Sequence, residues 1–256
     1  MSENLIERLS ALVQGFVDDR DQIAVIIQSK SDPAISIGVN ETLPIPSASI
    51  VKTAIACAAA DEGEAHLSKT MKISDLDDTF YCSIIHAFDQ NEQISIKTLI
   101  GLMLIVSDNP ATSAVVGSIG MDKVNHWLRQ NDLSNTKLSV GFDDASLGAP
   151  LRANLTTAVD CLRLLRNIDT RSEYTFIKNM LANNLRNERI PKFLPEEVVI
   201  AHKTGTLNGL AHDMAIIDGP NTGYYVVILA DGLPQEHDFA NEIARFSKQA
   251  YALMSA

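Results

Sequence analysis

Cysteine, aromatic residues and basic charge are scarce in this sequence, and each scarcity excludes a class of protein. The 256 residues include three cysteines and one tryptophan, and aromatic residues make up only 5%. Cys57, Cys82 and Cys161 are widely spaced and form no C-x-x-C pair, which excludes a disulfide framework and a zinc-finger pattern. The six histidines follow no metal-binding spacing. We therefore expect neither a metal nor another cofactor.

Acidic residues outnumber basic ones, 32 against 21, which gives a net charge of −11. Nucleic-acid phosphates and anionic lipid surfaces would repel such a chain. No run approaches the roughly 20 apolar residues that a membrane span requires, and the first residues are acidic where a signal peptide would be basic. We expect a small-molecule substrate, no nucleic-acid or membrane partner, and a cytoplasmic location, or export if a leader was removed.

Hydrophobic residues make up 46% of the chain, enough for a sizeable core. Apolar residues from Leu5 to Phe16 recur at helical spacing, and a closing helix is predicted over 236–254. Short β-branched segments predict strands, and they lie at the two ends of the chain: 22–28, 34–38, 197–203, 213–218 and 224–230.

The middle of the chain is predicted to be mostly helical, with candidate helices over 48–61, 95–106, 110–118, 121–130, 156–168 and 172–184. The simplest packing is an α+β fold in which N- and C-terminal strands form one antiparallel sheet flanked by the terminal helices. We expect one domain, 1–256, with a sheet lobe over 1–46 and 190–256 and an all-helical lobe over 47–189. A cleft between the lobes is the natural place for a site.

Ser49 and Lys52 form an S-x-x-K string at the start of a predicted helix. A spacing of three places the hydroxyl and the amine on one helix face. A lysine can accept the proton of a serine hydroxyl when burial or nearby positive charge lowers its pKa. The string also arises by chance, since Ser134 and Lys137 form a second copy, so it does not identify a nucleophile by itself.

Two further strings have an ordinary structural explanation when each is taken alone. Ser107-Asp108-Asn109 predicts the end of one helix and the cap of the next, because Pro110 suits the first helical turn. Lys203-Thr204-Gly205-Thr206 ends a predicted strand. It could simply turn there, or it could set a positive charge beside exposed backbone N–H groups, with Gly205 letting a substrate lie close to the strand.

Together the strings S-x-x-K, S-D-N and K-T-G, in this order, resemble the active-site serine β-lactamase and penicillin-binding protein superfamily. Each occupies the expected context: a helix start, a loop between helices and the end of a late strand. The chain is most similar to the class A β-lactamase-like serine hydrolases of that superfamily. The resemblance covers nearly the whole chain, including the strand–helix–strand layout and the sequence segments 154–160 and 193–205.

The resemblance implies a catalytic group of three side chains. Ser49 would be the acylated nucleophile, Lys52 its proton partner, and Ser107 the relay that passes a proton to the leaving nitrogen. The backbone N–H groups of Ser49 and Thr206 would form the oxyanion hole. Acyl transfer needs a nucleophile, a base, a leaving-group acid and an oxyanion site, and the strings supply a candidate for each.

The resemblance also implies a group of substrate-binding residues. Asn109 would hold the side-chain amide of the substrate, and its carboxylate would be received by the K-T-G string, that is, Lys203, Thr204, Gly205 and Thr206. Lys203 would in addition keep the pocket positive. Two lysines near one serine favour each other's deprotonation, which makes a neutral Lys52 less costly.

One feature departs from the class A pattern. Those enzymes carry a glutamate after S-D-N that activates the water releasing the acyl group, whereas no glutamate occurs here between Glu92 and Glu173. Asp143 and Asp144 lie in the corresponding loop and are candidates for that role, although an aspartate is one methylene shorter; the alternative is an ordinary turn pair. The sequence thus supports acylation, but not rapid deacylation.

The sequence therefore predicts a β-lactamase-type serine hydrolase that acts on β-lactams or related carboxylate-bearing amides and esters. One alternative is a D-alanyl-D-alanine peptidase or esterase-like penicillin-binding enzyme, which β-lactams acylate and whose acyl-enzyme is hydrolysed slowly. Another is a non-catalytic module that binds a ligand without turnover.

Overall fold

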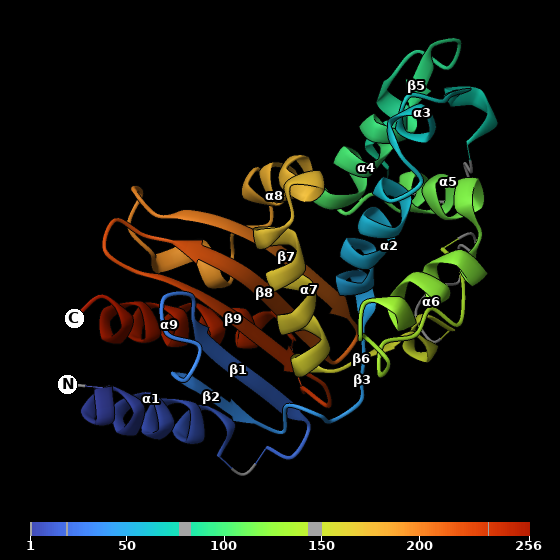
Figure 1. Ribbon diagram of the computed structural model, residues 1–256. Coiled ribbons are helices and arrows are strands. Elements are labelled where there is room, and N and C mark those ends of the chain that lie inside the picture. Colours follow the sequence, from blue (N-terminus) through green and yellow to red (C-terminus); the bar gives the residue numbers. More distant parts are fainter. Residues whose placement is uncertain (1, 19, 77–82, 143–149, 235) are drawn as a thin grey trace.

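A five-stranded antiparallel sheet forms the centre of the computed structural model (Figure 1), which describes residues 2–18, 20–76, 83–142, 150–234 and 236–256. The strand order is β2–β1–β9–β8–β7, so N-terminal strands pair directly with C-terminal ones. The strands are β1 (Ile23–Ser29), β2 (Ser36–Val39), β7 (Val199–Leu207), β8 (Leu210–Asp218) and β9 (Gly223–Ala230). The predicted α+β class is confirmed.

The sheet is covered on both faces, which explains why its central strands are apolar throughout. All seven residues of β1 are buried, and they alternate between two cores: Val25 and Ile27 face one, and Ala24 and Ile26 the other. Helices α1 (Ser2–Val17) and α9 (Glu236–Met254) cover the first face (Figure 1). Helix α7 (Ala158–Thr170) contacts β1, β8 and β9 from the opposite side.

The remaining helices surround α2 (Val51–Ala60), in which nine of ten residues are buried. Alanines 54, 56, 58 and 59 let neighbouring helices approach it closely. Those neighbours include α4 (Ile96–Ile105), α5 (Asn109–Ile119), α6 (Met121–Gln130) and the short α3 (Glu64–Leu67). Helix α8 (Thr175–Ala182) joins this group to the sheet by contacting both α4 and β7.

Short elements that the sequence pattern did not predict complete the fold. Strands β3 (Ile45–Pro46) and β6 (Leu155–Thr156) pair beside the start of α2, and β4 (Thr70–Lys72) pairs with β5 (Gln93–Ser95). Six 3₁₀ helices are present among the described residues, of which η1 (Ala48–Ile50) leads into α2. The division into a sheet lobe and a helical lobe stays a prediction.

One expectation about a strand was wrong. The K-T-G string does not end its strand, because β7 continues to Leu207 and pairs with β8 along its full length. Lys203 is therefore a mid-strand residue whose side chain is fully buried. β7 is also an edge strand, so one row of its backbone N–H and C=O groups has no partner strand.

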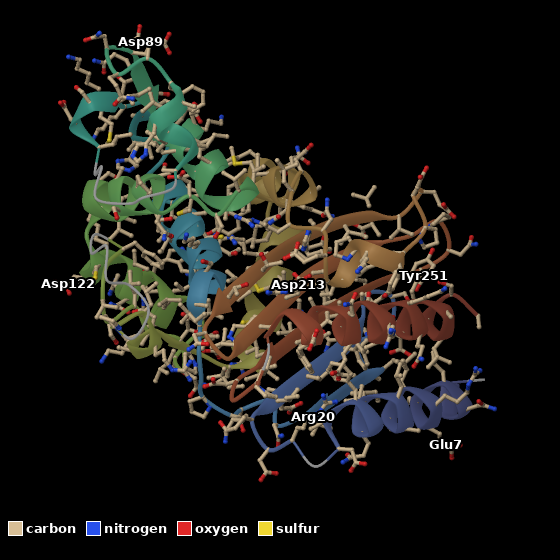
Figure 2. The ribbon with its side chains drawn as sticks, turned by 180° about the vertical axis from the view of Figure 1, so that it is seen from behind. Glu7, Arg20, Asp89, Asp122, Asp213 and Tyr251 are labelled. Carbon is tan, nitrogen blue, oxygen red and sulfur yellow. The ribbon has the colours of Figure 1, made fainter. Side chains whose placement is uncertain are left out.

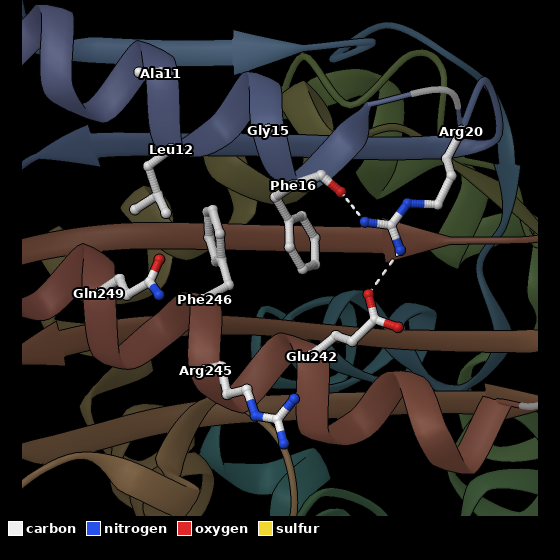
Figure 3. A pocket seen from close by; sticks show the side chains of 9 residues that line it. All are labelled: Ala11, Leu12, Gly15, Phe16, Arg20, Glu242, Arg245, Phe246 and Gln249. Carbon is white, nitrogen blue, oxygen red and sulfur yellow. Dashed lines mark hydrogen bonds and ion pairs between the residues drawn. The ribbon is translucent and has the colours of Figure 1, made fainter.

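Between α1 and α9 lies a cavity of about 360 Å³ at the outer face of the molecule (Figure 3). Arg20 spans its rim, donating to Glu242 at 2.7 Å and to the carbonyl oxygen of Phe16. The rings of Phe16 and Phe246 lie side by side, with centroids 4.5 Å apart. This cavity is lined by none of the residues of the three strings.

Other observations concern ions and membranes. No group of three or more potential metal-ligating side chains occurs among the described residues. Within the same residues, no helix combines the length and apolar character needed to cross a bilayer. Cys57 and Cys161 are buried thiols, while Cys82 lies outside the described residues.

Candidate active site

Ser49 lies on η1, in the short connection between β3 and α2. The preceding residue, Ala48, has φ = 46°, a left-handed conformation that costs energy for a residue with a Cβ. Surrounding contacts hold it: the Ser47 N–H donates to Asn154 O at 2.7 Å, and the Ile50 N–H donates to Ser47 O at 3.0 Å. The result is a serine half-buried at the wall of a cavity.

Lys52 lies in the first turn of α2 and is fully buried. Its Nζ donates to Ser107 O at 2.7 Å, to Ser107 Oγ at 3.3 Å and to Asn109 Oδ1 at 2.6 Å. Burial, and then the charge of Lys203, lower the pKa of Lys52 well below its usual value. The neutral amine that a serine nucleophile requires is thereby made accessible.

The S-D-N string caps a helix and also accepts hydrogen bonds from Lys52. Asp108 caps α5, accepting from the Ala111 N–H at 2.9 Å, and its other oxygen accepts from Ser83 Oγ at 2.6 Å. Because Asp108 is fixed in this way, its two neighbours in the sequence, Ser107 and Asn109, are held where both accept hydrogen bonds from Lys52. Ser107 itself has φ = 62°, a second left-handed residue at the site.

Lys203 reaches the same serine from the sheet. Its Nζ donates to Ser107 Oγ at 3.0 Å and to Thr204 O at 2.9 Å. Burial lowers the pKa of Lys203 to about 7, and the charges of Arg186 and Arg189 contribute to the lowering, against Asp213. Ser107 Oγ therefore lies between two buried amines that come from different parts of the fold.

Gly205 lies at a close approach between two elements, and its expected role beside the substrate stays a prediction. A Cβ at this position would lie 3.2 Å from Ala48 Cβ, 3.1 Å from Ile50 Cγ1 and 3.2 Å from His212 Cδ2. These distances are shorter than ordinary carbon contacts. The missing side chain thus lets η1, which carries Ser49, pack directly against β7.

A cavity of about 280 Å³ unites the three strings. Its lining includes Ser49, Ser107, Asn109, Thr204 and Thr206, together with three residues that the sequence analysis did not select: Arg186, Glu188 and Arg189. Lys52 and Lys203 lie behind this wall, where they contact Ser107. The second S-x-x-K copy, Ser134 to Lys137, is not among the lining residues.

The three missed residues belong to the segment between α8 and β7. Arg189 is buried and donates to Gly205 O at 2.8 Å, to Thr206 Oγ1 at 2.6 Å and to His212 O. The sequence signal was a pair of arginines in the segment that leads to the strand carrying K-T-G. Such a pair is common on protein surfaces, so only the tertiary structure distinguishes it.

Two histidines near Lys203 serve packing. His202 contacts Asp213 Oδ1 through Nδ1 at 3.0 Å, and Asp213 lies buried on β8 (Figure 2). His212 contacts Pro46 O through Nε2 at 2.7 Å, while its Nδ1 accepts from the Ala230 N–H at 3.0 Å. Burial lowers the pKa of His212 to about 4, so its ring is neutral at pH 7.

An aromatic ring lies beside Lys52 on another side. The ring centroid of Phe142 is 5.0 Å from Lys52 Nζ, and Phe142 is buried, an arrangement that stabilises an ammonium. Asp143 and Asp144, the candidates for water activation, lie outside the described residues. Within the described part of the chain, no carboxylate forms a hydrogen bond or an ion pair with Lys52.

Comparison with protein families decides the assignment, since a model described as "Beta-lactamase enzyme family" matches residues 4–254. The chain belongs to the beta-lactamase enzyme family. It is thus a serine hydrolase of the beta-lactamase type, as its motifs indicated. A comparison with curated protein sequences gives no match.

Solved structures support the fold of this beta-lactamase family member. The TLA-1 extended-spectrum beta-lactamase superposes with a TM-score of 0.87 at 20% identity, covering 98% of this chain and 99% of that one. A class A beta-lactamase from Bacteroides cellulosilyticus gives 0.83 at 20%, covering 100% and 99%. PBP-A gives 0.78 at 21%, covering 97% and 96%. Similarity at these identities establishes the architecture alone.

Proposed function

We propose that this beta-lactamase family hydrolase forms an acyl-enzyme through Ser49 with β-lactams or related carboxylate-bearing amides and esters. The observation that carries the proposal is the convergence of Lys52 and Lys203 on Ser107 Oγ at the wall of the cavity that Ser49 lines. The substrate is a small molecule; the net charge of −11 argues against nucleic acid as a partner.

In the acylation step, Ser49 Oγ attacks the carbonyl carbon while its proton passes to neutral Lys52. The carbonyl oxygen becomes an oxyanion, for which the backbone N–H groups of Ser49 and Thr206 are the proposed donors. When the C–N bond breaks, Ser107 passes a proton to the departing nitrogen and regains one from a lysine. Ser107 suits this relay because it accepts from both amines.

The remaining side chains hold the substrate. Thr204 and Thr206 line the cavity and offer two hydroxyls to the substrate carboxylate, and the ammonium of Lys203 lies behind them, against Thr204 O and Ser107 Oγ. Gly205 keeps β7 close to η1. The amide of Asn109 lines the cavity and is oriented by its hydrogen bond to Lys52. Its Nδ2 group is thereby directed away from Lys52, toward a substrate carbonyl.

The direct test is covalent labelling. We expect a fluorescent penicillin to label the wild-type protein with a mass increase of one intact penicillin, and Ser49→Ala to abolish the label. Ser134→Ala is the matched control, because Ser134 begins the second S-x-x-K string and is exposed. Equal labelling of wild type and Ser49→Ala would refute the proposal, as would tight binding of a β-lactam without any adduct.

A second candidate is a penicillin-binding peptidase or esterase whose acyl-enzyme is long-lived. The observation that favours it is the buried apolar ring of Phe142, whose centroid lies 5.0 Å from Lys52 Nζ. Lys52 already donates to three oxygens of Ser107 and Asn109. Neither feature provides a general base for hydrolysis of the ester.

Nitrocefin separates the two candidates. Many turnovers per enzyme support a beta-lactamase, whereas a single stoichiometric burst supports the long-lived acyl-enzyme. Asp143→Asn and Asp144→Asn locate the base if turnover is observed: loss of turnover with an intact burst would assign water activation to that aspartate. Unchanged turnover in both variants would exclude them.

A further inference from the structure

Arg186 is a cation at the wall of the cavity that Ser49 also lines, and its guanidinium is not paired with another described side chain. The residue is exposed and lines the cavity. Its guanidinium has no hydrogen bond or ion pair with any other described residue. Arg189, by contrast, uses its guanidinium to hold β7.

The backbone beneath Arg186 is firmly held although the side chain is exposed. The Arg186 N–H donates to Asn184 Oδ1 at 2.8 Å, and the buried Asn184 donates in turn to Leu104 O and His202 O, both at 3.1 Å. Leu104 lies three residues before Ser107, and His202 directly precedes Lys203. The side-chain amide of Asn184 therefore fixes the backbone of Arg186 relative to the segments that carry Ser107 and Lys203.

A second anchor lies on the other side of Arg186. Asn187 Oδ1 contacts His202 Nε2 at 3.1 Å, and the Ile190 N–H donates to Asp213 Oδ2 at 3.0 Å. The segment is thus attached to β7 and β8 on both sides of the arginine. An uncommitted charge on a fixed backbone loses less entropy when it binds a ligand than one on a free loop.

The field of Arg186 extends over the whole site. Its charge lowers the pKa of both Lys52 and Lys203. Two carboxylates oppose it more strongly, Asp108 at Lys52 and Asp213 at Lys203. Glu188 is the only carboxylate among the described residues that line the cavity. The lining of the cavity nevertheless carries two guanidinium groups against one carboxylate, within a chain whose net charge is −11, and a positive lining attracts anions.

We propose that Arg186 binds a second anionic group of the substrate, so that the preferred substrates are dianions with a carboxylate on the acyl side chain besides the one bound by Lys203. This inference rests on the proposed function, since it assigns the first carboxylate to Lys203 and Thr204. With those groups occupied, Arg186 is left to pair with another anion in a bidentate arrangement.

Two penicillins provide the test. Carbenicillin differs from benzylpenicillin by one additional carboxylate on its side chain. The measured quantity is the ratio of their second-order rate constants for acylation of Ser49, followed by intact-protein mass spectrometry. We expect Arg186→Gln to lower this ratio about tenfold and Arg186→Glu to lower it further. Added salt should lower the wild-type ratio as well.

The ratio of the two acylation rate constants distinguishes binding of the additional carboxylate by Arg186 from an effect of Arg186 on acylation in general. Loss of Arg186 changes both lysine pKa values and so affects both penicillins, whereas the attraction of Arg186 for the additional carboxylate acts on carbenicillin alone. Arg129→Gln removes the same charge from an exposed position on α6 and should leave the ratio unchanged.

An equal ratio in wild type and Arg186→Gln would overturn the inference, and so would an equal fall in Arg129→Gln. Both results leave the proposed function intact as long as Ser49 is labelled. Absence of labelling by either penicillin would instead refute the proposed function.

Discussion

Two buried lysines have different roles at the residue scale because their surroundings differ. Lys52 is surrounded by acceptors from Ser107 and Asn109 and has its pKa lowered by burial and by Lys203. Lys203, with a pKa lowered by burial to about 7, changes its charge near neutral pH. Because the two amines influence each other, acylation should depend on apparent pKa values that belong to the pair.

Acylation should consequently decline at alkaline pH. Above about pH 7 the ammonium of Lys203 loses its proton, and with it the charge that the substrate carboxylate requires. We expect Lys203→Arg to move this alkaline limb to higher pH, since a guanidinium stays charged. The measurement is the acylation rate constant from pH 5 to 10, with circular dichroism as a folding control. An alkaline limb at the same pH in both proteins would show that another group sets it.

At the scale of elements, the proposed acylation depends on how closely η1 approaches β7. Ala48 and Ile50 of η1 occupy the space that a side chain at Gly205 would fill. Both are almost completely buried, so neither can move outward easily. The absence of a side chain at Gly205 therefore lets Ser49 lie close to the strand that carries the proposed carboxylate site.

Gly205→Ala should separate these two elements. The added Cβ forces η1 or β7 to shift by a few tenths of an ångström, which should destabilise the protein by about 1–3 kcal/mol and slow acylation by up to ~10²-fold. Thermal unfolding and the fluorescent-penicillin rate measure the two effects. Gly117→Ala on α5 is the control, because a Cβ added there would have open space within 4 Å. Full activity of Gly205→Ala would show that the contact is unimportant.

At the scale of the whole molecule, His212 connects the sheet to the segment that precedes the nucleophile. Its ring lies between Pro46 O and the Ala230 N–H, and only the neutral ring can accept from the latter. Burial lowers the pKa of His212 to about 4 from an ordinary value of 6.5. The unfolded chain therefore binds a proton below pH 6.5 that the folded protein does not.

This difference makes stability depend on pH. The contribution of His212 is complete above pH 6.5 and is lost progressively as the pH falls toward 4, by roughly 3 kcal/mol in total. We expect His212→Asn to unfold with a weaker dependence on pH over this interval, as measured by urea denaturation at fixed pH values. Parallel curves for the two proteins would show that other groups cause the acid destabilisation.

The sequence by itself determined the types of the elements and the three motifs. Alternating and helical apolar patterns depend on neighbouring residues, so the sheet strands, α6 over 121–130 and α9 over 236–254 were predicted closely. Capping also acts locally: Thr157 Oγ1 accepts from the Asp160 N–H at the start of α7, close to the predicted helix start at residue 156. The end of β7 was misplaced because its continuation to Leu207 depends on pairing with β8.

Only the tertiary structure decided what surrounds the motifs. Arg186 and Phe142 reach the site because packing brings together segments that lie far apart along the chain. The same packing removes water from Lys52 and Lys203 and so lowers their pKa values. Local backbone preference extends over a few residues, whereas burial and electrostatic potential depend on every segment that surrounds a group. For that reason the chemistry could be predicted from three short strings, while the charge and shape of the cavity could not.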